Sequence, residues 1–264
     1  MGHSALGPFL YIWEKPGAAL GVDSNVKPVP FAYHRPATLD EALALLAADE
    51  DAKPLAGGQS LVPMLNFRLA RPSALVDLCA IEELTGIRLE GDVLVVGAMT
   101  RQWDLEHWPD AFPLLRQALG FVGHTATRCR GTVGGSLVHA DPTAELPVCA
   151  LALRAELVTS RRTIPAEEFF VSVFTTVLEP GELLVEVRFP APSGRTAFEE
   201  HAHRHGDFAV VCVAGAGERV VVGGVAPTPV FWNETGLDPV GDLFAPAGYK
   251  RDVAKALVER ALGR

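Results

Sequence analysis

Two parts of the chain place apolar residues at the spacing of an amphipathic helix. In the first, Thr38-Leu39-Asp40-Glu41 has the form of a capping box, in which a hydroxyl and a carboxylate satisfy free N–H groups at the start of a helix. Leu39, Leu43 and Leu46 then share one face of a helix predicted to end near residue 48. The second helix is predicted at about 249–262, with an apolar stripe of Val253, Leu257 and Ala261 beside Ala254 and Val258.

Shorter apolar runs between these helices predict an α+β fold. Strands are expected near 53–56 (buried), 75–78, 93–96, 155–159 and 183–189, and helices near 113–120, 143–153 and 166–170. The cluster Pro190-Ala191-Pro192-Ser193-Gly194 is our predicted domain boundary. Beyond it, strands are expected near 197–203, 209–214 and 219–225. We therefore expect one domain over 27–190 and, over 195–264, a small three-stranded sheet covered by a helix.

Composition narrows the possible functions. The 264 residues include 48% hydrophobic residues, 25 Gly and 20 Pro, which is typical of a turn-rich globular protein. A formal charge of −9, without a basic stripe, argues against nucleic-acid binding. No apolar run approaches the ~18 residues of a membrane span, so we expect none.

Cysteine usage and the N-terminus point to a cytoplasmic protein. The four cysteines form no Cys-x-x-Cys pair, so no local iron–sulfur or zinc site is predicted. Instead we expect buried, reduced thiols. Residues 1–26 carry an apolar stretch that no Lys or Arg precedes, unlike a signal peptide. We expect them to be a poorly ordered extension.

Two glycine-rich turns carry the most specific chemistry of the sequence. They are Ala56-Gly57-Gly58-Gln59-Ser60-Leu61 and Gly131-Thr132-Val133-Gly134-Gly135-Ser136, and the second runs on to Asp141-Pro142-Thr143-Ala144-Glu145-Leu146-Pro147. Glycine permits positive φ and a close approach, so backbone N–H groups can converge on an anion. Two such turns suit two linked phosphates. A single Gly-Gly pair is also typical of a tight bend, and neither turn is a Gly-x-Gly-x-x-Gly fingerprint or a Walker loop.

Both turns resemble those of the FAD-binding subunit of molybdenum hydroxylases, the group of xanthine dehydrogenase, aldehyde oxidase and aerobic carbon monoxide dehydrogenase. Further segments similar to this family are 31–42, 128–132, 178–184 and 204–209. The resemblance covers about 27–262. It implies a two-lobed FAD-binding domain of the PCMH type and a smaller C-terminal module. The family's module is longer, so we expect the segment 232–249 to be shortened here.

The resemblance also implies which residues hold FAD. The first turn grips the pyrophosphate, Glu145 helps to hold the cofactor, Leu184 packs on the isoalloxazine ring, and Asp207 and Phe208 reach back toward the flavin. Two alternatives stay open, because Asp141-Pro142 also has the form of a helix start and Leu184 also suits an ordinary core strand. The implied set is Pro54, Leu55, Ala56, Gly57, Gly58, Gln59, Ser60, Leu61, Val122, Thr132, Val133, Gly134, Gly135, Ser136, Asp141, Glu145, Leu184, Asp207 and Phe208.

Two features depart from this simple picture. Cys129 stands where the family often has Asn, so a side-chain amide is lost beside the second turn. His201, His203 and His205 alternate, and in a strand they would share one face, as zinc or nickel ligands or, in our preferred interpretation, as a polar rim at a subunit contact. We predict no resident metal.

No nucleophile motif or acid–base pair stands out, which favours an electron-transfer role, because a flavin supplies the redox chemistry itself. The resemblance implies an FAD-carrying subunit that takes electrons from 2Fe–2S clusters on a small partner subunit and passes them to an external acceptor such as a quinone, NAD or oxygen. A large partner subunit would hold the molybdopterin cofactor, in a dimer of heterotrimers. The alternatives are a self-contained flavin oxidase of the vanillyl-alcohol type and a scaffold subunit without flavin.

Overall fold

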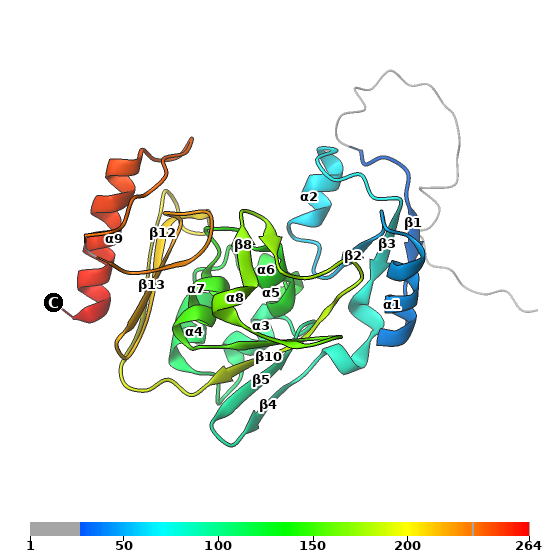
Figure 1. Cartoon of the computed structure of the whole chain (residues 1–264), viewed down its shortest axis with the longest axis horizontal. Coiled ribbons are helices and arrows are strands. Elements are labelled where there is room, and N and C mark those ends of the chain that lie inside the picture. Colours follow the sequence, from blue (N-terminus) through cyan, green and yellow to red (C-terminus); the bar gives the residue numbers. More distant parts are fainter. Residues whose placement is uncertain (1–26, 234, 264) are drawn as a thin grey trace, which may run out of the picture.

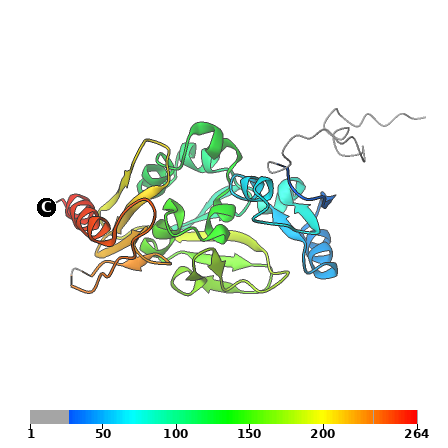
Figure 2. The ribbon, with the colours of Figure 1, turned by 90° about the horizontal axis from the view of Figure 1, so that it is seen from above.

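The chain forms three parts that follow one another along the long axis of the molecule (Figure 1). The computed structural model describes residues 27–233 and 235–263, so the extension predicted at 1–26 lies outside the described residues. An N-terminal lobe, a central five-stranded sheet with its helices, and a C-terminal sheet with one helix make up the three parts (Figures 1 and 2).

The N-terminal lobe is built on three short parallel strands. β1 (Ala32–His34), β3 (Ala74–Asp77) and β2 (Lys53–Leu55) lie side by side in that order, and α1 (Leu39–Ala48) packs against them. The predicted capping box is present: the Thr38 hydroxyl accepts the Glu41 N–H (3.2 Å), while the Glu41 carboxylate accepts the Ala37 N–H (2.8 Å), one residue earlier than expected.

The strand predicted at 53–56 is present as β2, but its predicted burial is wrong. β2 is an edge strand, with Lys53 and Pro54 exposed. Proline suits such an edge because it donates no hydrogen bond to a neighbouring strand. The strand leads directly into the first glycine turn, which is followed by α2 (Leu61–Asn66).

The central part is an antiparallel sheet in the order β4-β5-β10-β6-β7. Its strands are β4 (Ile87–Glu90), β5 (Val93–Gly97), β10 (Leu184–Pro190), β6 (Glu156–Thr159) and β7 (Thr163–Pro165). Its helices are α3 (Gln102–His107), α4 (Pro113–Leu119), α5 (Thr125–Arg130), α6 (Val133–His139), α7 (Glu145–Ala152) and α8 (Ala166–Phe169), and a hairpin of β8 (Phe170–Ser172) and β9 (Thr175–Thr176) follows α8.

The C-terminal sheet has four antiparallel strands. β11 (Thr196–Ala202), β12 (Ala209–Ala216) and β13 (Arg219–Gly223) match the three predicted strands, and β14 (Val230–Phe231) adds a fourth that is too short to show in the sequence pattern. α9 (Ala247–Leu262) covers the outer face of this sheet (Figures 1 and 2). α4 and α7 pack on the inner face.

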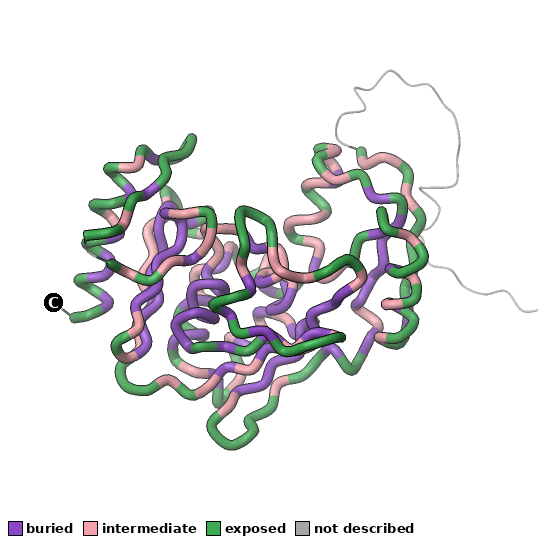
Figure 3. The backbone as a smooth tube through the Cα atoms, in the orientation of Figure 1, coloured by how far each residue is buried: buried purple, intermediate pink, exposed green. Residues whose placement is uncertain are grey.

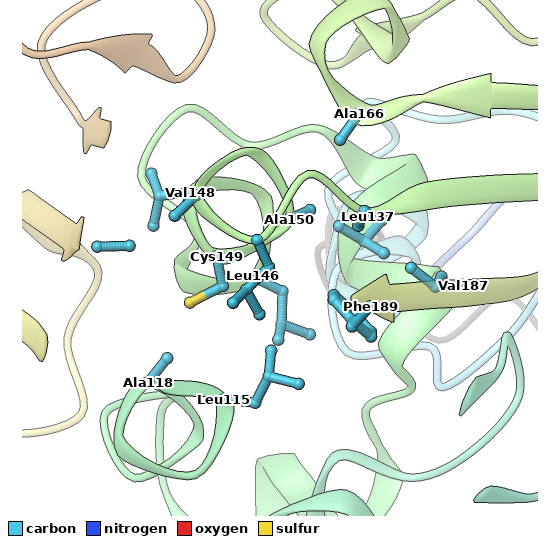
Figure 4. Close-up of a cluster of buried hydrophobic side chains, with 14 of the residues drawn as sticks. Leu115, Ala118, Leu137, Leu146, Val148, Cys149, Ala150, Ala166, Val187 and Phe189 are labelled. Carbon is cyan, nitrogen blue, oxygen red and sulfur yellow. The ribbon is translucent and has the colours of Figure 1, made fainter. Parts of the chain in front are cut away.

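The main hydrophobic core joins the central and C-terminal parts. Figure 4 shows Leu115 of α4, Leu146 and Cys149 of α7, and Phe189 of β10 in one cluster, with the sulfur of Cys149 on the side away from Phe189. The inner face of the C-terminal sheet contributes Phe198 and other side chains to the same cluster. Buried residues accordingly run through the centre of the molecule and into the C-terminal sheet (Figure 3). The C-terminal sheet is therefore held on the central part by shared apolar packing.

The three alternating histidines do not share a face. β11 ends at Ala202, before His203 and His205. His201 is hydrogen-bonded to the Tyr249 hydroxyl (2.8 Å), His203 donates to the Phe244 carbonyl (3.3 Å), and the His205 ring meets His124. The alternative that these three histidines bind zinc or nickel together is therefore not supported by their positions.

Candidate functional site: a cavity between the two glycine turns

A cavity of about 630 Å³ lies where the N-terminal lobe, the central part and a loop of the C-terminal part meet. This volume is in the range of small-molecule and cofactor sites. Its walls come from β2 and the first glycine turn, the start of α6, the start of β10, and the loop at 206–208. Segments as far apart in the sequence as Lys53 and Phe208 therefore build one site.

The first glycine turn presents unused hydrogen-bond donors to this cavity. Within the described part of the chain, no acceptor pairs with the N–H groups of the five residues from Gly57 to Leu61. The Ser60 hydroxyl makes no capping bond at the start of α2. Gly58 has φ of +74°, a conformation that glycine adopts without strain. Converging free amides of this kind form an anion-binding concavity, as the sequence predicts.

The second glycine turn is different, because it is the first turn of α6. Thr132 is the N-cap, and its hydroxyl accepts the Gly135 N–H (3.1 Å). Three further N–H groups are also used: Val133 donates to Thr100, Gly134 to Ala98 and Ser136 to Thr132. The expectation of a second open amide cradle is therefore wrong. This turn lines the cavity with hydroxyl-bearing side chains and with glycine backbone that a ligand can approach closely.

Glycine is required in the second turn for packing. A Cβ on Gly134 would lie 2.6 Å from the Cβ of Ala98, and a Cβ on Gly131 would lie within contact distance of the Gln102 side chain. The two turns also touch each other. A Cβ on Gly57 would lie 2.8 Å from the Cα of Gly131 and closer still to the Arg130 carbonyl. Each turn thus fixes the position of the other.

The other implied FAD residues reach the cavity from separate elements. Val122 and Glu145 are buried in its wall, Leu184 stands at the start of β10, and Asp207 and the exposed Phe208 come from the loop after β11. Two implied residues do not line it. Leu55 lies outside the lining, and Val133 is fully buried because its side chain packs into the main core.

Asp141 lines the cavity without starting a helix. Its carboxylate accepts the Thr143 N–H (2.9 Å) and the Thr143 hydroxyl (2.7 Å), forming a local turn. α7 begins later, with Ala144 as N-cap and Glu145 as its first residue. The alternative of an Asp141 N-cap is therefore wrong, since the side chain satisfies the turn instead.

Charge in the cavity wall is mostly negative. Burial raises the pKa of Glu145 to about 7, and the nearby Asp141 adds to this shift. His139 also lines the cavity, and burial lowers its pKa, so its imidazole is neutral at pH 7. Of the described residues in the lining, Lys53 is the only Lys or Arg. It is therefore the side chain best suited to neutralise a phosphate.

Sequence reasoning missed several lining residues, Lys53 among them. Its position three residues before Ala56, the first residue of the predicted anion-binding turn, was a usable signal. Glu182 also lines the cavity and belongs to the family-like segment 178–184, whereas Gln102 and Thr127 follow no motif and arrive there only through tertiary contacts. The predicted burial of the cysteines holds for Cys149 and Cys212, whereas Cys129 is exposed. The position where this chain has Cys129 and the family often has Asn therefore lies on the surface of α5.

The residues present fit a dinucleotide such as FAD. The free N–H groups of the first turn, the Ser60 hydroxyl and Lys53 together match a pyrophosphate. Apolar walls formed by Val122, Leu184 and others match aromatic ring systems. None of the helices in the described ranges is long and apolar enough to cross a membrane.

Comparison with known proteins agrees with this fit. A family model for the FAD binding domain in molybdopterin dehydrogenase matches residues 29–192. The chain is 37% identical to the 6-hydroxypseudooxynicotine dehydrogenase complex subunit alpha of Paenarthrobacter nicotinovorans, covering 90% of this chain and 95% of the relative. It is 36% identical to the carbon monoxide dehydrogenase medium chain of Hydrogenophaga pseudoflava, covering 89% and 96%. A solved structure of carbon monoxide dehydrogenase from that organism matches with a TM-score of 0.85 at 35% identity, covering 89% of this chain and 97% of the matched chain.

The alignment with the first relative spans 282 positions, more than the 264 residues of this chain, so the relative has segments that this chain lacks. The relatives are subunits of dehydrogenases, and the fold agrees with that of the solved carbon monoxide dehydrogenase chain. The chain therefore belongs to the FAD-binding subunits of molybdenum hydroxylases and is a subunit of an oxidoreductase.

Proposed function

We propose that this chain is the electron-transfer subunit of its complex. It binds FAD in the cavity between the glycine turns, receives electrons from 2Fe–2S clusters on a small partner subunit, and passes them to an external acceptor such as a quinone, NAD or oxygen. The observation that carries this proposal is the run of five unpaired N–H groups from Gly57 to Leu61 at the cavity wall. A buried or half-buried run of free donors is costly unless a ligand accepts from it.

The chain's own residues bind and orient the cofactor. The first turn, Ser60 and Lys53 hold the pyrophosphate, and contact with the second turn keeps the first turn in place. Leu184 at the start of β10 supports the isoalloxazine ring, and Asp207 and Phe208 also line the cavity. When bound, FAD supplies both two-electron and one-electron redox chemistry.

The partners follow from the family. We propose a small subunit with two 2Fe–2S clusters and a large subunit with the molybdopterin cofactor, assembled as a dimer of heterotrimers in the cytoplasm. The substrate would bind to the large subunit, which explains why relatives with similar FAD subunits are named for compounds as different as 6-hydroxypseudooxynicotine and carbon monoxide. We also infer that the domain boundary falls at 190–195, because the C-terminal sheet begins at Thr196.

The alternatives predict different behaviour. A self-contained flavin oxidase would reduce its flavin with an organic substrate and without any partner chain. A scaffold subunit would bind no flavin. In the described residues, the elements beyond the FAD-binding domain are the C-terminal sheet and α9, and this sheet shares its core with the FAD-binding domain. These elements are too small to form a separate substrate domain.

Mixing the purified proteins tests the proposal. The full chain loaded with FAD is mixed anaerobically with the small subunit, whose clusters have been reduced and then separated from the reductant. We expect the visible absorbance of the flavin to bleach only when the reduced small subunit is present. Failure of the chain to bind FAD, or an unbleached flavin after mixing, would overturn the proposal.

A further inference from the structure

The wall of the FAD cavity contains a buried side-chain amide, that of Gln102. We propose that Gln102 is a further binding residue for FAD: its side-chain oxygen accepts a hydrogen bond from a sugar hydroxyl of the cofactor, on the ribityl chain or on the ribose. The proposal rests on the proposed function, because it takes the cavity as the FAD site. It concerns a residue outside both glycine turns and outside the segments that resemble the family.

The Gln102 side chain is buried without a partner for its oxygen. Gln102 is the first residue of α3, it lines the cavity, and only 4% of it is exposed. Its Oε1 atom is buried, and no group within residues 27–233 and 235–263 donates a hydrogen bond to it. An unpaired buried acceptor costs free energy, and native proteins seldom keep one. A ligand in the cavity is in the right place to supply the missing donor.

Contacts with the second glycine turn hold Gln102 in this position. Its backbone N–H donates to the Gly131 carbonyl (2.9 Å), and the preceding residue, Arg101, forms a β-bridge with Thr132. The amide fits because Gly131 has no side chain: a Cβ there would lie only 2.4 Å from Oε1. The amide is therefore a fixed part of the cavity wall.

The neighbours of Gly131 indicate which part of FAD the amide meets. Gly131 lies next to the Gln102 amide and also next to Gly57, since a Cβ on Gly57 would be 2.8 Å from the Cα of Gly131. Gly57 begins the run of free N–H groups proposed to bind the pyrophosphate. The amide is thus close to the phosphate site. In FAD, the groups that adjoin the pyrophosphate are the ribityl chain on one side and the ribose on the other, and both carry hydroxyls.

A hydroxyl suits this amide better than the other polar groups of FAD do. An ionised phosphate has no hydrogen to donate, so it cannot pair with Oε1. The N–H groups of the two ring systems lie at the far ends of the dinucleotide, away from the pyrophosphate. A hydroxyl both donates and accepts, so it can pair with the amide oxygen and also with the amide NH₂ group if the amide rotates.

Fluorescence titration of the full-length apoprotein with FAD, together with thermal unfolding, tests this inference. Gln102→Met keeps the length of the side chain and removes both polar atoms. We expect its affinity for FAD to fall about tenfold, because the hydroxyl is left unpaired. Its apoprotein should melt no lower than the wild type, because an unpaired buried amide has been replaced by an apolar group.

Gln117→Met is the matched control. Gln117 accepts the Phe198 N–H (3.1 Å) and lies outside the cavity lining. Loss of this acceptor should lower the melting temperature and leave the affinity for FAD unchanged. The two substitutions are therefore expected to have opposite effects on stability and on binding.

Gln102→Leu repeats the measurement with a second apolar side chain. An affinity for FAD within about threefold of the wild type in either folded variant would overturn the proposal, since Oε1 would then be paired with water alone. A lower melting temperature of both apoproteins would also overturn it, because the role would be structural. If the wild type itself binds no FAD, the proposed function fails instead, so the two failures are distinguishable.

Fragments of FAD used as competitors identify the hydroxyl. In Gln102→Met, FMN should compete more weakly if the contact is to the ribityl chain, and ADP should do so if it is to the ribose. Inorganic pyrophosphate, which has no hydroxyl of this kind, should compete as it does in the wild type. Equal weakening of pyrophosphate, or full strength of both FMN and ADP, would overturn the assignment to a sugar hydroxyl.

Discussion

Gly57→Ala is expected to separate the two glycine turns and to weaken FAD binding. The new Cβ would lie 2.8 Å from the Cα of Gly131 and closer still to the Arg130 carbonyl. Both neighbours are backbone atoms, so no flexible side chain can move aside. One of the two turns must shift, and the first turn carries the free N–H groups that face the cavity.

The size of the effect follows from two contributions. Overpacking of this kind costs about 1–3 kcal/mol of unfolding free energy. Displacing even one N–H that bonds to a charged phosphate loses a further ~1.5–3 kcal/mol of binding free energy. Since ~1.4 kcal/mol corresponds to a factor of ten, the dissociation constant for FAD should rise by about tenfold to one hundredfold.

Flavin fluorescence titration and thermal unfolding of the apoprotein measure the two contributions separately. The melting temperature should fall by about 2–4 °C for each kcal/mol lost. Gly248→Ala is the matched control, because a Cβ at that position of α9 meets no atom within 4 Å. The control should bind FAD like the wild type and melt slightly higher. If Gly57→Ala binds FAD within about threefold of the wild type, the contact between the turns does not position the site.

Three further changes test other parts of the structure. Lys53→Gln should weaken FAD binding about tenfold at low salt and reduce its salt dependence, as measured by titration at two ionic strengths; unchanged affinity would mean that Lys53 does not meet the phosphates. Arg128→Ala should lower the free energy of unfolding, measured by chemical denaturation, by about 3–5 kcal/mol. The reason is that it removes the guanidinium whose Nε lies 2.7 Å from Oε2 of Glu106. A loss below about 1 kcal/mol would contradict this reasoning. Burial raises the pKa of Glu182, but the Arg162 guanidinium and other donors lower this pKa more, so its net shift is downward. The charged Glu182 therefore stabilises the fold above pH 4.5, and this stabilisation is lost as the pH falls. Glu182→Gln should flatten the acid dependence of the melting temperature, and an unchanged slope would refute this reasoning.

Local signals in the sequence predict the elements but not their tertiary relations. The capping box and the apolar stripe of α9 depend on residues three or four apart, so they are visible in one segment. Glu199 and Glu200 show the opposite case. Strand alternation places adjacent residues on opposite faces, but only the packing of α4 and α7 decides which face is buried. The sequence therefore predicts the strand near 197–203 but not that the Oε2 atom of Glu200 is buried.

The two glycine turns show the same difference between pattern and packing. Both contain Gly-Gly followed within two residues by a serine, and both line one cavity, so the sequence predicts the same role for each. Their amides differ because β5 and the segment that follows it lie beside the second turn and accept its N–H groups through Ala98 and Thr100. Within residues 27–233 and 235–263, no such acceptor lies beside the first turn, where Gly57 contacts the backbone of Arg130 and Gly131 without a hydrogen bond. The first turn is therefore the donor, and the second is the rigid surface that holds it at the right distance from the cavity.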